Sequence, residues 1–132
     1  MKKLIARFAQ TLLRSASGGS DEKGQPSMVT LRDIRQPGDS RSLTASLAGD
    51  GSLEIVGLDY GDGVEQSFGQ REYEWRWHVE PAEVVKLQEA LDTQDHLMTA
   101  LQARFSGHAA ANLQSFLNEH QIVYKSWSRV GD

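Results

Sequence analysis

Residues 71–81, REYEWRWHVEP, decide the fold. Aromatic or apolar side chains occupy every second position, at Tyr73, Trp75, Trp77 and Val79. Glutamates, an arginine and a histidine occupy the positions between them, which is the period of two typical of a half-buried strand. Pro81 suits the first position of a helix, where its missing N–H leaves no bond unmade. The stretch predicts a strand with an aromatic core face and a charged face, followed by a helix.

Three further strands are predicted before this one. Residues 29–35 alternate apolar and polar side chains and end at a Pro-Gly pair that favours a turn. Residues 43–47 and 53–57 alternate in the same way. Between them, Asp50-Gly51 suits a two-residue hairpin turn, because glycine adopts a positive φ freely. The segments form consecutive antiparallel strands in this prediction.

The segments around residue 71 and beyond residue 81 complete the expected fold. Residues 59–70, DYGDGVEQSFGQ, are predicted as a loop. Three helices are expected after Pro81, the second of them capped by Asp92-Thr93, and residues 122–130 are expected to form a last strand. The predicted class is α+β: an antiparallel four-stranded β-meander followed by three helices packed on one face and a C-terminal strand.

The 132 residues divide into a basic segment, a linker and one domain. Residues 1–14 place apolar side chains at helical spacing beside four lysines and arginines. Residues 15–27 are rich in serine and glycine and form the linker, so residues 28–132 are expected to form a single globular domain. The first segment is too short to span a membrane, and surface contact with anionic lipid is its alternative role. We expect a cytoplasmic protein.

Charge is distributed unevenly along the chain. Residues 1–41 carry eight basic and four acidic side chains, whereas residues 42–132 carry six basic and fourteen acidic ones. The two parts therefore have formal charges of +4 and −8, and the whole chain −4. This balance disfavours binding to nucleic acid, which needs a basic surface, and favours a basic protein partner. Because the chain has no cysteine, disulfides and cysteine-zinc sites are excluded.

Motifs for phosphate, dinucleotide or acyl-transfer chemistry are missing: the sequence has no GxGxxG, GxxxxGK or GxSxG pattern. The four histidines form no HExxH pair. Asp59, Asp62 and Glu65 are close enough to suggest a calcium loop, but their spacing differs from that of an EF-hand, and Asp62-Gly63 favours a turn. We expect no metal ion and no cofactor.

The charged face of residues 72–80 is the best candidate site in the sequence. Glu72, Glu74 and His78 are two residues apart or four, so they would be neighbours on one exposed face. Carboxylates beside a histidine can perform acid–base chemistry, while a solvated face or a partner-binding surface is the alternative. Trp75, Trp77 and Trp127 could form an aromatic platform, although alternating aromatics in a strand usually belong to the core.

Several of these elements together resemble a family of small bacterial proteins. The shared elements are a Leu-Asp-x-Gly stretch, a Val-Glu pair, a Glu-Tyr-Glu-Trp strand and a final Trp-Ser. In this chain they correspond to Leu58, Asp59 and Gly61, to Val64 and Glu65, to Glu72 to Trp75, and to Trp127 and Ser128. The resemblance covers residues 28–132 and implies the fold and a bacterial origin. It implies no activity, cofactor or substrate, and no catalytic residue is carried over.

The sequence leads to two functional hypotheses. The first is a non-enzymatic protein-interaction module that binds a basic partner through an acidic surface, as an immunity or inhibitor protein does. Its surface would comprise Asp59, Asp62, Glu65, Glu72, Glu74 and His78. The second is a small hydrolase or ligand-binding domain that uses His78 with Glu72 and Glu74, which requires these groups to line a pocket.

Overall fold

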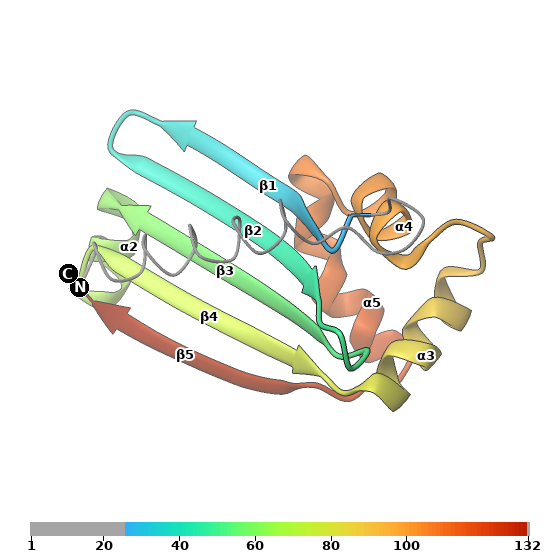
Figure 1. Cartoon of the computed structure of the whole chain (residues 1–132). Helices are drawn as coiled ribbons and strands as arrows, with labels where there is room; N and C mark the ends of the chain where they lie inside the picture. The colour runs from blue at the N-terminus through green and yellow to red at the C-terminus, as the bar shows by residue number, and fades with distance from the viewer. Residues whose placement is uncertain (1–25, 132) are drawn as a thin grey trace.

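A five-stranded antiparallel sheet forms the centre of the molecule (Figure 1). The computed structural model describes residues 26–131, so the basic segment 1–14 and most of the linker lie outside the described residues. The strands follow one another in space in their sequence order, as a meander. They are β1 (Met28–Gln36), β2 (Asp39–Leu47), β3 (Leu53–Gly61), β4 (Glu72–Val79) and β5 (Lys125–Gly131). The predicted meander and C-terminal strand are confirmed, and they belong to one sheet.

The helices lie at the two ends of the sheet. Between β4 and β5 the chain forms α3 (Pro81–Leu91), α4 (Leu97–Arg104), the 3-10 helix η1 (Gly107–Asn112) and α5 (Leu113–Glu119). These pack against one face, and α2 (Asp62–Phe68) lies at the opposite end of the strands (Figure 1). The predicted loop over residues 59–70 is therefore wrong in part, because β3 continues to Gly61 and a short helix follows it.

The two hairpin connections differ in length. Gln36 pairs with Asp39, so Pro37-Gly38 is a two-residue turn in which Gly38 has a φ of 82°. The predicted two-residue turn at Asp50-Gly51 is wrong, because Leu47 pairs with Leu53 and leaves five residues in the loop. The Asp50 carboxylate organises this longer loop by accepting hydrogen bonds from the backbone N–H and hydroxyl of Ser52.

The core lies between the helices and one face of the sheet. Period-two apolar positions of the strands meet the apolar stripes of the helices there, which removes these side chains from water. Its most buried members include Leu43, Leu53, Ile55, Val79, Leu87, Met98, Leu101, Leu113 and Leu117. The predicted cap of the second helix is wrong: His96 caps α4, and its Nδ1 accepts a hydrogen bond from the N–H of Met98 at 3.2 Å.

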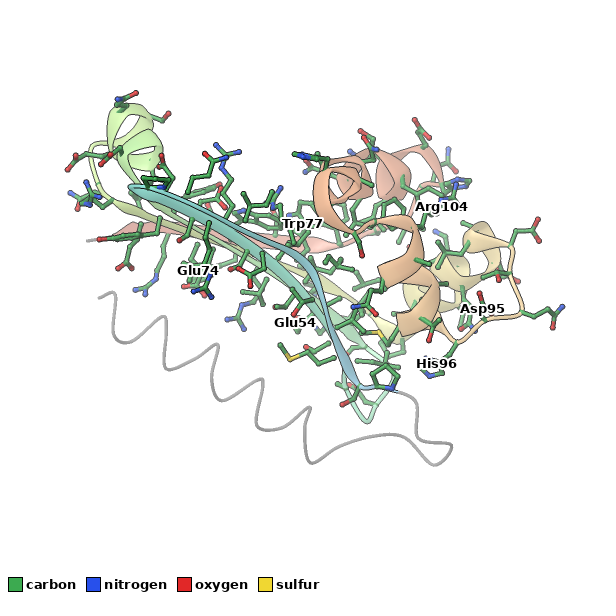
Figure 2. All side chains as sticks on the ribbon, turned by 90° about the horizontal axis from the view of Figure 1, so that it is seen from above. Glu54, Glu74, Trp77, Asp95, His96 and Arg104 are labelled. Atoms are coloured by element: carbon green, nitrogen blue, oxygen red, sulfur yellow. The ribbon has the colours of Figure 1, made fainter. Side chains whose placement is uncertain are left out.

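The opposite face of the sheet, called the open face below, carries the charged positions of β3 and β4. Figure 2 shows Glu54 and Glu74 pointing away from the side on which α4 and α5 lie. The expectation that the glutamates of β4 are exposed is wrong, because Glu72 is 2% and Glu74 is 4% exposed. Glu74 accepts a hydrogen bond from Arg129 at 3.3 Å and pairs with Arg76 at 3.5 Å. Among the described residues, no helix has both the length and the apolarity to cross a membrane.

Candidate functional site

Two adjoining cavities open on the helix side of the sheet. Their volumes are about 510 and about 390 Å³, and Arg32 and Ala111 line both. Together they form a depression, called the aromatic trough below, between η1 and the uncovered parts of the strands. Besides these two residues its main lining consists of Tyr73, Trp75, Trp77, Gln114, Tyr124, Ser126, Ser128, Ile34 and Arg41.

A row of aromatic rings forms one part of the trough. The ring centroids of Trp75 and Trp77 are 4.6 Å apart, and those of Trp77 and Tyr124 are 5.1 Å apart. Trp75 lies directly over Gly57 of β3, since a Cβ at Gly57 would come within 2.1 Å of the indole ring. The Tyr124 hydroxyl accepts a hydrogen bond from Gln114 at 3.0 Å. These contacts hold the rings in place at the cavity instead of burying them fully.

Arg32 reaches the trough because β1 contains an irregularity. The pairing with β2 shifts between Thr30 and Arg32, as in a β-bulge, so Arg32 lies opposite the core residue Leu43. Its Nη2 is 3.9 Å from Oδ1 of Asp59, which is an ion pair beyond hydrogen-bond distance. Burial raises the pKa of Asp59, and the opposing effects of Arg32 and Arg41 are smaller. No hydrogen bond of Arg32 Nε or Asp59 Oδ1 is formed within the described part of the chain.

The structure divides the six residues of the predicted acidic surface among three places. Asp59 lies on the helix side of the sheet beside Arg32. Asp62 and Glu65 belong to α2, where both carboxylates accept hydrogen bonds from Nη1 of Arg71, at 2.9 and 3.3 Å. The other three residues belong to the open face: Glu72, Glu74 and His78. The six residues therefore do not share one continuous surface.

His78 has different partners from those expected. Its Nδ1 is 2.5 Å from the Glu54 carboxylate, and its Nε2 is 3.6 Å from that of Glu80. The hydrogen bond to Glu54 is the main cause that raises the pKa of His78. His78 lines none of the three cavities found in residues 26–131. The pocket that the hydrolase hypothesis requires is thus not formed around this residue by those cavities.

Replacement of His78 by glutamine should lower the free energy of unfolding only where the histidine is charged. Because the folded state raises the pKa of His78, its pair with Glu54 stabilises fully below the ordinary value of about 6.5. This contribution is lost as the pH rises through the folded pKa. For a partly exposed pair we expect a loss of about 0.2–1 kcal/mol at pH 5.5 and almost none at pH 9. Urea denaturation at both pH values measures it.

His108→Gln is the matched control for this measurement, because His108 is exposed on η1. The control should change stability by the same small amount at both pH values. Equal losses for His78→Gln at pH 5.5 and pH 9 would contradict the ionic contribution of the Glu54 pair.

Two other sequence alternatives receive no support from the geometry. Within residues 26–131, no group of three or more histidines and carboxylates is placed to hold a metal ion. The three tryptophans do not form one platform: Trp75 and Trp77 pack together, while the guanidinium of Arg76 lies 5.7 Å from the Trp127 ring. Comparison of the chain with protein-family models, curated proteins and solved structures finds no match in any of the three.

Proposed function

We propose that this domain is a non-enzymatic protein-interaction module that binds an extended segment of a partner protein in the aromatic trough. The observation that carries this proposal is the position of Arg32, a half-enclosed cation at the junction of both cavities. Its side chain is 15% exposed, and its ion pair with Asp59 is too long for a hydrogen bond. A guanidinium carries five N–H donors, so Arg32 is suited to bind carbonyl groups of a chain lying in the trough.

The aromatic rings supply the second part of the recognition. Trp75, Trp77 and Tyr124 offer large apolar surfaces beside polar groups, a combination that is common at protein interfaces. The trough is long and open, with Arg32 near its middle, which fits an extended chain better than a compact small molecule. Apolar side chains of the partner would contact the rings while its backbone contacts Arg32.

Net charge bears on the choice of partner. Residues 26–131 contain nine basic and fifteen acidic side chains, a formal charge of −6. Such a domain attracts a basic protein over distances of about a Debye length, which increases the rate of association. The basic partner proposed from the sequence is therefore retained. Its contact surface becomes the aromatic trough in this proposal, because the carboxylates of β4 are buried.

Arg32→Ala should weaken binding of a trough ligand about 10- to 100-fold. Removal of a charge-assisted hydrogen bond costs about 1.5–3 kcal/mol, which corresponds to that change in Kd. The full chain would be used to select ligands from a displayed library of random heptapeptides, and the Kd of each selected peptide would be measured by fluorescence anisotropy. Arg35→Ala is the matched control, since Arg35 belongs to the same strand, is 81% exposed and lines neither cavity of the trough.

The control should change Kd less than twofold. The proposal is wrong if no heptapeptide is selected, or if the selected peptides bind the Arg32→Ala and Arg35→Ala variants equally well. Circular dichroism and melting temperature establish that both variants are folded.

A further inference from the structure

We infer that the partner segment binds as a sixth strand along the free edge of β5, with alternate side chains entering the aromatic trough. This inference rests on the proposed function and adds the mode of binding and the pattern of the ligand. It depends on three observations: the regularity of β5, the protection of the other sheet edge, and the small side chains that separate β5 from the trough.

β5 is an outer strand with a regular backbone. It pairs only with β4 in the described sheet, and its register runs without a shift from Glu72↔Gly131 to His78↔Lys125. The outer edge of such a strand presents backbone N–H and C=O groups to solvent. Positions 125–128 are all exposed, including Trp127 at 49%. The edge therefore has the geometry that strand addition requires.

β1, the outer strand on the other side, is protected in ways that β5 is not. Its pairing with β2 is interrupted between Thr30 and Arg32, and the Gln102 side chain of α4 donates a hydrogen bond to the Thr30 carbonyl at 3.3 Å. Bulges and covering side chains are devices that prevent pairing with a further strand. Because β1 has both and β5 has a continuous register, the two edges differ in availability and β5 is the one open to a partner.

The side-chain alternation of β5 connects its edge with the trough. Ser126 and Ser128 line the larger cavity and pair with Trp77 and Trp75 of β4. Their small side chains leave the space beside the tryptophans accessible from the strand edge. On an added strand, every second side chain would project over these serines into the cavity. The ligand should thus carry apolar residues at alternate positions.

The cations of β5 do not oppose a basic partner, because each has a carboxylate nearby. Lys125 is 3.1 Å from Glu80, and Arg129 is 3.3 Å from Glu74. Repulsion from like charges is therefore reduced at this edge, whereas the domain as a whole remains acidic. An extended, basic segment with alternating apolar side chains satisfies the edge, the cavity and the net charge together.

Amide hydrogen exchange of the full chain, measured by NMR with and without the tightest selected heptapeptide, tests the inference. We expect exchange at alternate amides of residues 125–130 to slow at least tenfold in the complex, since only alternate N–H groups of an outer strand point to a new neighbour. Amides of β1 serve as the internal control and should not change. Methylation of alternate peptide nitrogens should lower affinity with a period of two.

The outcomes separate this inference from the proposed function. If the peptides bind and depend on Arg32 but the β5 amides exchange at unchanged rates, strand addition is excluded and the trough remains the binding site. If the peptides pair with β1 or bind as a helix, strand addition at β5 is likewise overturned. If no heptapeptide binds, the proposed function itself fails.

Discussion

Gly61→Ala should destabilise the domain by about 2–6 kcal/mol. Gly61 has a φ of 128°, in a region that residues with a side chain rarely adopt, which costs about 1–3 kcal/mol. An added Cβ would also lie 1.9 Å from the Gly38 carbonyl and 2.7 Å from the Cα of Asp39. These are backbone atoms of the turn between β1 and β2, so relief requires movement of that turn, at about 1–3 kcal/mol more. Urea denaturation at pH 7 measures the loss.

Two other glycines separate the contributions at Gly61. Gly69 has a φ of 77° but no atom within 4 Å of an added Cβ, so Gly69→Ala should show the cost of backbone strain alone. Gly49 has neither a positive φ nor a close neighbour, and Gly49→Ala should change stability by less than about 0.5 kcal/mol. A loss at Gly61 no larger than that at Gly69 would show that the approach of Gly38 contributes nothing.

Gly57→Ala should displace Trp75 and damage the trough as well as the fold. The added Cβ would lie 2.1–2.6 Å from three atoms of the indole, which is held between Gly57 and Trp77. Overpacking of this kind costs about 1–3 kcal/mol. Because the ring has to move, the near-ultraviolet circular dichroism of the tryptophans should change. Affinity for a trough-binding heptapeptide should fall at least tenfold while the variant remains folded at 25 °C.

Gly63→Ala is the control for the second substitution. Its added Cβ would make only an ordinary contact at 3.5 Å, and alanine favours a helix more than glycine does. The control should therefore keep or slightly raise the stability and leave peptide affinity unchanged. An unaltered dichroism spectrum for Gly57→Ala would contradict the close packing of Trp75 on β3.

The sequence predicts the strands well because their side-chain alternation reflects one buried face. It does not predict α2, since residues 62–68 include no apolar stripe of helical period and carry the glycine and aspartate typical of turns. Likewise, a histidine is not the usual cap of a helix, so the geometry at His96 has no clear sequence signal. Alternation also states only which face a residue occupies, and the burial of Glu72 depends on tertiary structure.

The trough was not predictable for related reasons. Counting every second residue assigns Arg32 to the face opposite Leu31, and only the bulge in β1 brings both to the core side. One signal was present and not used: an isolated glycine inside a strand often marks the close approach of another group. Gly57 has that role, since its missing side chain makes room for Trp75. Such a glycine beside alternating tryptophans would have pointed to the cavity.

The late position of β5 in the chain has a consequence for the order of folding. The first four strands pair through short connections, whereas β5 must find β4 across the whole helical region, from His78 to Lys125. Closure of so long a loop costs entropy before its contacts form, so β5 should dock late. Until then β4 has an unpaired edge that can capture strands of other chains, and high protein concentration during refolding should favour aggregation.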